Sequence, residues 1–177
     1  MRHLLATLAL LLLAVTAYAD VTIEDVSWGL RQAPKIAIRP GVFQAITEWN
    51  QTPARKLPAV PRVSIMLINN GGTVEGLVLR YAVSAKVANI KDPAQKADWG
   101  LPFWMSEHRV PYLKAGQKLQ LTIEDLRLFT SLSDMYRAGF WPTALKIEIM
   151  VKPRLGDPIP RGVSEKAMPV VWTKAAP

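Results

Sequence analysis

Cysteine is absent from this chain, and histidine occurs only twice. Without cysteine the protein can form no disulfide, no thiol nucleophile and no thiolate metal site. Other than His3, the only histidine is His108, so a catalytic triad or a histidine-based metal site would depend on that residue alone. We interpret His108 as an ordinary surface histidine, and we expect no catalytic residue, no metal and no cofactor.

Long apolar runs are also scarce, and the one that is present lies at the start of the chain. The run 4–17 follows a short polar head that contains Arg2 and ends with small residues at positions 17 and 19. This arrangement is typical of a secretory signal peptide. About 14 apolar residues are too few to cross a bilayer, which takes about 20. We therefore expect a signal peptide at residues 1–19, a single domain at residues 20–177, no stable membrane insertion after cleavage, and a periplasmic or secreted protein.

Acidic residues are fewer than basic ones, with 14 Asp and Glu against 22 Lys and Arg and a formal net charge of +8. Loss of Arg2 with the signal peptide leaves 21 basic residues against the same 14 acidic ones, a charge of +7. The basic residues are scattered, so we interpret them as a soluble surface that favours anionic partners. Nucleic acid is not an expected partner of an exported protein, and Gly71-Gly72 lacks the context of a phosphate-binding loop.

The most regular pattern in the sequence is the alternation from Leu77 to Val87. Odd-numbered positions there are apolar, whereas the even-numbered ones include Arg80 and Lys86. Such alternation predicts a strand with one face on a core and one face in water. The apolar run 63–68 precedes it and ends in Asn-Asn-Gly-Gly at 69–72, a sequence that favours tight turns. We expect these two strands to be neighbours and to form the centre of the core.

Shorter patterns predict further strands. Alternation predicts strands at 20–28, with a bulge near Glu24 or Asp25, and at 35–39, 118–123 and 145–151, with a last strand at 170–172. Prolines indicate loops at 51–62 and 153–169, and Pro111 is expected to end a strand at 103–110.

Two segments have helical spacing. Apolar residues recur every three or four positions at 42–50, which favours a helical face, although extended structure stays open there. Helical spacing at 128–136 predicts a short helix across the gap between two sheets. Ser131 and Asp134 resemble a capping box for it, and Gly139 can end it.

About seven short strands with interposed loops and one or two short helices indicate an all-β fold, an immunoglobulin-like antiparallel β-sandwich. The succession of 63–72, 77–87, 113–123 with its Leu-Lys-Ala-Gly-Gln turn, and 145–151 resembles bacterial CARDB-type and fibronectin-like modules. In those families an apolar strand that ends in Asn-Gly is followed by a tyrosine-bearing strand and by one introduced by Leu-x-x-Gly-Gln. The resemblance implies a binding or structural module without catalytic residues. The long loop 89–105 and the helix after Ser131 depart from the family pattern.

The densest aromatic group in the chain lies in the loop that starts at 89. We identify Trp99, Phe103, Trp104 and the later Trp141 as candidate binding residues, because rigid aromatic side chains on loops are common in recognition surfaces. The same residues could instead close one end of the core. We expect Phe103 to be buried, and at least one of Trp99 and Trp104 to stay accessible beside Trp141 with basic residues nearby.

These observations lead to three functional hypotheses. The first is an exported, non-catalytic β-sandwich that binds another protein or an anionic envelope component. The second is a carbohydrate-binding module whose aromatic rings stack on sugars. The third is a carboxylate-dependent hydrolase, for which the available groups are Glu107, His108, Glu124 and Asp125, although adjacent acids at a strand end are usually solvated.

The alternation also predicts which side chains face the core, because a slip of one residue would reverse the two faces. The expected core residues are Leu79, Tyr81, Val83, Leu121, Ile123, Ile147 and Ile149, and the expected outward residues are Arg80, Lys86, Lys118, Lys146 and Lys152.

Overall fold

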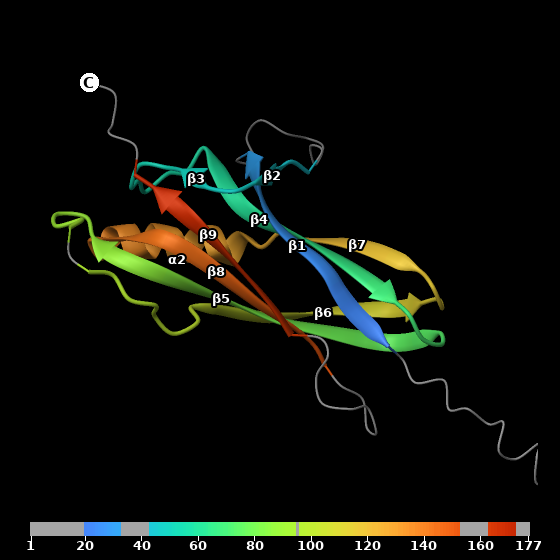
Figure 1. Ribbon diagram of the computed structural model, residues 1–177. Coiled ribbons are helices and arrows are strands. Elements are labelled where there is room, and N and C mark those ends of the chain that lie inside the picture. Colours follow the sequence, from blue (N-terminus) through green and yellow to red (C-terminus); the bar gives the residue numbers. More distant parts are fainter. Residues whose placement is uncertain (1–19, 33–42, 95, 153–162, 173–177) are drawn as a thin grey trace, which may run out of the picture.

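The computed structural model describes residues 20–32, 43–94, 96–152 and 163–172 (Figure 1). The expected signal peptide at 1–19 and the expected strand at 35–39 lie outside these residues. The elements along the chain are β1 (Val21–Gln32), β2 (Ala45–Ile46), β3 (Trp49–Asn50), β4 (Ala59–Asn69), β5 (Val74–Asn89), β6 (Trp104–Leu113), β7 (Lys118–Ile123), α2 (Leu126–Arg137), β8 (Phe140–Val151) and β9 (Val163–Val171).

The strands form two sheets that face each other across an apolar core, so the expected all-β sandwich is confirmed. The first sheet has the order β2-β1-β4-β7, and the second has the order β3-β9-β8-β5-β6. Their strand pairs are antiparallel except for β3 and β9, which are parallel. Both sheets twist, and the long strands β5 and β8 extend along most of the second sheet (Figure 1).

The two strands at the centre of the sequence do not pair with each other, and this expectation was wrong. β4 lies in the first sheet between β1 and β7, whereas β5 lies in the second sheet between β8 and β6. The connection between them therefore crosses from one sheet to the other. Asn69 stabilises this connection through two hydrogen bonds. Its side-chain amide donates to the carbonyl of Gly72 at 2.8 Å, and its Oδ1 accepts from the N–H of Gly71 at 3.1 Å.

The predicted faces of the strands agree with the structure. Of the seven expected core residues, Leu79, Tyr81, Val83, Ile123, Ile147 and Ile149 are buried, and Leu121 is half-buried at the edge of the first sheet. Arg80, Lys118 and Lys152 are exposed, whereas Lys86 and Lys146 are half-buried on the outer face. Core residues of both sheets belong to one cluster, which also contains three fully buried tryptophans, Trp28, Trp49 and Trp141.

The bulge in β1 is confirmed, because the register of β1 against β4 shifts between Ile23 and Asp25. Further along β1, Gly29 allows a close approach of the chain at 43–44: a Cβ atom there would lie 2.7 Å from the Gln44 carbonyl oxygen. The segment 42–50 contains no helix where the structure describes it, so the helical face was wrong and the extended alternative holds for its two short strands. It forms β2 and β3, and Trp49 is buried because it packs on Trp141 with ring centroids 6.2 Å apart.

Three prolines lie inside strands where loops or strand ends were expected. β4 begins at Ala59 and includes Pro61, β6 continues through Pro111, and β9 begins at Val163 and includes Pro169. Pro61 precedes the part of β4 that pairs with β7, and β6 is an outer strand of its sheet. A proline is tolerated at such places because its missing N–H need not be used by a second neighbour.

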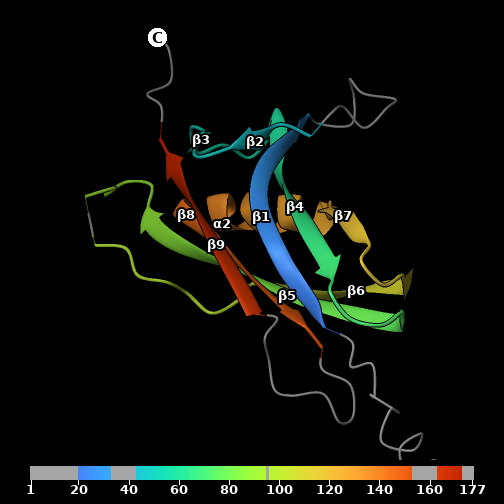
Figure 2. The ribbon, with the colours of Figure 1, turned by 45° about the vertical axis from the view of Figure 1, so that its right-hand side comes forward.

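The helix α2 lies between the two sheets, as expected, and contacts β4 of the first sheet and β6 and β8 of the second (Figure 2). Its N-cap is Asp125, whose side chain accepts from the Arg127 N–H at 2.8 Å, so the expected capping box at Ser131 and Asp134 was wrong. The helix begins at Leu126, two residues before the expected start at 128, because Asp125 caps it there. Gly139 follows the C-cap with φ of +84°, which confirms it as the terminating glycine.

Candidate binding surface

The loop from Ile90 to Phe103 is attached to the part of β5 that β6 leaves unpaired. The Gly100 N–H donates to the Ala85 carbonyl at 3.0 Å, and the Phe103 N–H donates to the Val83 carbonyl at 3.0 Å. Trp99 forms an isolated bridge with Lys86. These contacts fix the end of the loop against the second sheet, so its side chains have defined positions beside β5.

The structure separates the four candidate binding residues into two groups. Trp99 is 43% exposed, whereas Trp104 is 6% exposed and Trp141 is fully buried. Phe103 is only half-buried, so the expectation that it is buried was wrong. The expectation that Trp141 borders an accessible surface was therefore wrong, and Trp104 is likewise not positioned to meet a ligand. The expected basic neighbour is present at Trp99, because the Lys146 ammonium lies 5.4 Å from the centre of its ring.

Packing explains the burial of the other two tryptophans. Trp104 stands opposite Val83 on the inward face of β6, and its ring meets that of Tyr81 edge-on at 5.3 Å between centroids. Trp141 packs between Trp49 and Tyr136, the latter also edge-on with centroids 6.3 Å apart. These rings fill the core at two places along β5, Trp104 opposite Val83 and Trp141 opposite Ala88. A core role of this kind was considered as the alternative to binding.

Two apolar residues that the sequence did not single out as site residues complete the surface around the loop. Leu101 is 90% exposed and Phe140 is 42% exposed. Together with Phe103 they border an apolar pocket of about 220 Å³, whose remaining walls are Ala85, Val87, Gly100, Met135 and Ala138. We call Trp99, Leu101, Phe103 and Phe140 the loop surface. Leu101 lies between Gly100 and Pro102, residues that favour an exposed turn and could have identified it, but no sequence signal placed Phe140 next to it.

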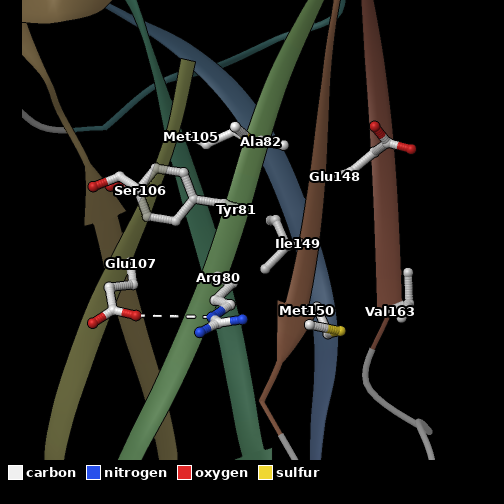
Figure 3. Close-up of a pocket in the computed structure, with 10 residues that line it drawn as sticks. All are labelled: Arg80, Tyr81, Ala82, Met105, Ser106, Glu107, Glu148, Ile149, Met150 and Val163. Carbon is white, nitrogen blue, oxygen red and sulfur yellow. Dashed lines mark ion pairs between the residues drawn. The ribbon is translucent and has the colours of Figure 1, made fainter. Parts of the chain in front are cut away.

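A second hollow lies on the outer face of the second sheet (Figure 3). It has a volume of about 540 Å³ and extends over β6, β5, β8 and β9. Met105 and Val163 are the most exposed of its apolar side chains. Figure 3 shows the ion pair of Arg80 with Glu107 at 3.8 Å along one side. The hollow combines apolar side chains with charges that already have partners.

The carboxylates considered for a hydrolase are engaged by basic side chains. Glu124 accepts from Arg31 at 2.8 Å and from Arg62 at 3.0 Å, and it links β1 to β4. Asp125 caps α2, and hydrogen bonding from the Arg127 side chain lowers the pKa of its carboxyl group. Glu107 contacts both Arg80 and Arg109 on the outer face. His108 is exposed but points to the opposite side of β6, because it stands opposite the core residue Leu79. Each of these carboxylates therefore has at least one basic partner in the structure.

The described part of the chain contains no group of three or more His, Cys, Asp or Glu residues arranged to hold a metal ion. Among the same residues, no helix is long and apolar enough to span a membrane. No family model matches this chain, and a search of curated proteins finds no similar sequence.

Proposed function

We propose that this protein is an exported, non-catalytic β-sandwich that binds another protein or an envelope component through the loop surface. The observation that carries the proposal is a group of exposed apolar side chains on and around the loop: Leu101 is 90% exposed and borders one pocket with Phe140, and Trp99 precedes it in the same loop. Exposing large apolar side chains together is unfavourable in water, and such groups are typical of interaction sites. The resemblance to CARDB-type and fibronectin-like modules, with the export signal expected from the sequence, supports the same reading.

Leu101 provides the sharpest test, because its side chain contributes little to the core. The variant Leu101→Asp should fold with unchanged stability, as expected for an exposed site. It should lose the complexes that the wild-type protein forms when it is chemically crosslinked in an envelope fraction. Tyr112→Asp is the matched control, because Tyr112 is 48% exposed but lies toward the opposite end of β6. Crosslinked complexes that persist unchanged in Leu101→Asp would contradict the proposal.

A carbohydrate ligand is the second candidate, and the exposed ring of Trp99 is the observation that favours it. An exposed indole can stack on a sugar ring. Titration with polysaccharides and peptidoglycan should then change tryptophan fluorescence in the wild-type protein and leave the fluorescence of Trp99→Ala unchanged. An unchanged wild-type signal across the panel would remove this candidate and leave protein binding.

A further inference from the structure

β7 is one of the two outer strands of the first sheet, and β4 is its strand partner among the described residues. The Asn69 N–H donates to the Gln117 carbonyl at 3.1 Å, and the same register continues along the pair. The backbone groups of successive residues in an antiparallel strand point alternately to the two sides. The odd-numbered residues of β7 therefore bond to β4, and the N–H and C=O groups of Lys118, Gln120 and Thr122 point away from the sheet.

The other edges of the two sheets carry features that hinder the addition of a further strand. β2 and β3 are outer strands of only two residues each, so most of β1 and β9 lies next to an edge. β6 contains Pro111, and the outer side of β1 is interrupted by the bulge with its acidic residues at 24–25. β9 contains Pro169, and its Lys166 carbonyl already accepts from the Trp28 indole at 3.0 Å. β7 has no proline and no bulge, so its outward backbone groups form a regular edge.

The β7 edge is also locally neutral, although the chain as a whole carries a formal charge of +8. Its one charged side chain, Lys118, is paired with Glu24 at 2.7 Å. On the inward face, Leu119 and Leu121 are only half-buried, because no strand of the described part of the chain flanks them on the outer side. A strand added at this edge would cover both leucines and meet no uncompensated charge.

We propose that β7 pairs with β7 of a second copy of this chain, as antiparallel strands related by a two-fold axis. The outward backbone groups belong to even-numbered residues, so an even-numbered residue must stand opposite an even-numbered one. The register with the most complete ladder places Gln120 opposite its own equivalent, and Lys118 opposite Thr122 of the second copy. It brings no like charges together. Each Gln120 amide already donates one N–H to the Ser64 hydroxyl of its own chain at 2.9 Å, which leaves its second N–H and its carbonyl oxygen for the amide opposite. The first sheet then continues across the axis.

Engineered cysteines test this register directly, because the protein has no cysteine of its own. Hydrogen-bonded residues in an antiparallel pair have Cα atoms about 5.5 Å apart, a separation that a disulfide can bridge. Under mild oxidation Gln120→Cys should form a covalent dimer. Lys118→Cys is the matched control, since it would stand opposite Thr122 and not its own equivalent. The combination of Lys118→Cys with Thr122→Cys should restore the covalent dimer.

Sedimentation across a dilution series supplies the second measurement, without a covalent bond. The wild-type protein should associate reversibly into dimers. Thr122→Lys should raise the dissociation constant about tenfold, because the new lysine faces Lys118 in both symmetric pairs. A wild-type protein that stays monomeric across the series would overturn the proposal. So would a Lys118→Cys variant that forms as much disulfide as Gln120→Cys.

Discussion

At the scale of single residues, Asn69 connects two turns of the sandwich. It is fully buried, and its amide donates to the carbonyls of Gly72, Leu113 and Lys114 at 2.8 to 3.1 Å. The first of these carbonyls belongs to the crossing between β4 and β5, and the other two to the turn that joins β6 to β7. One side chain therefore hydrogen-bonds to carbonyls on both connections between the sheets, with its two amide hydrogens shared among three acceptors.

Replacing Asn69 should be costly, because several buried polar groups would lose their partners. We expect Asn69→Ala to lower the free energy of unfolding by about 3 kcal/mol. Asn70→Ala should change it by less than about 0.5 kcal/mol, since the Asn70 side chain is exposed and makes a long contact of 3.4 Å to Thr22. Denaturant unfolding of both variants measures the difference. Equal losses would show that the buried amide has no special role.

The tryptophans offer a second comparison of the same kind. We expect Trp141→Ala to lower the free energy of unfolding by about 3 to 5 kcal/mol, because it removes a fully buried ring from the core. Trp99→Ala should lower it by about 1 kcal/mol or less, because that ring is largely solvated and its contact with Lys146 is weak. Thermal or denaturant unfolding separates the two. A loss of several kcal/mol on truncating Trp99 would make it a core residue and argue against the loop surface.

At the scale of secondary-structure elements, the start of α2 depends on Asp125. The carboxylate caps the helix and contacts Arg127, which also reaches Ser106 of β6 at 3.1 Å. Because hydrogen bonding from Arg127 lowers the pKa of Asp125 in the folded protein, the folded state keeps this carboxylate ionised at lower pH than the unfolded chain does. The resulting stabilisation is complete above the ordinary pKa of 3.8 and is lost as the pH falls through the lowered value.

Two substitutions separate the cap from the charge. Asp125→Ala should cost about 1 kcal/mol at neutral pH, because it removes the capping oxygen. Asp125→Asn keeps a capping side chain and should cost less. Its difference from the wild-type protein should shrink toward zero as the pH falls below the range in which the wild-type carboxylate ionises. Unfolding free energies measured over a pH series test this, and a difference that does not vary with pH would contradict it.

The elements also show what a single sequence could and could not predict. Strict alternation located β5, β7 and the second half of β8, because a residue facing water must differ from one facing the core. The turn sequence 69–72 indicated a reversal but not its partner, since the same residues suit a hairpin within one sheet and a crossing between two. β9 was missed over most of its length because its residues before Met168 are exposed or half-buried, which leaves no apolar alternation to detect.

The candidate site was predicted in part, for a similar reason. The sequence identified the aromatic loop, and Trp99 lies at its surface. It could not tell that Trp104 begins β6 on the inward face, because the start of that strand depends on where the loop leaves β5. Phe140 joins the loop surface only through the packing of β8 beside β5, which brings together residues far apart in the chain.

At the scale of the whole molecule, the two sheets share one core. A hydrogen bond also joins them directly, because the Trp28 indole of β1 donates to the Lys166 carbonyl of β9. We therefore expect one cooperative unfolding transition. Tryptophan fluorescence and far-ultraviolet circular dichroism should give the same midpoint. A reducing agent should leave that midpoint unchanged, because the chain has no disulfide to lose. Two separated transitions would indicate that the sheets unfold independently.

The parallel pair of β3 and β9 places Trp49 beside Val170. This contact closes a loop that contains most of the domain. Closing so long a loop costs conformational entropy, and that cost arises before the contact between the two strands can stabilise the fold. β9 also completes the sheet beside β8, so the central strands have a full set of neighbours only after the chain has been made as far as Val171. Folding should consequently be slow for a chain of this size, on the scale of milliseconds to seconds. A partly emerged chain would present the open side of β8, which makes the interval before β9 docks the period of greatest risk of misassembly.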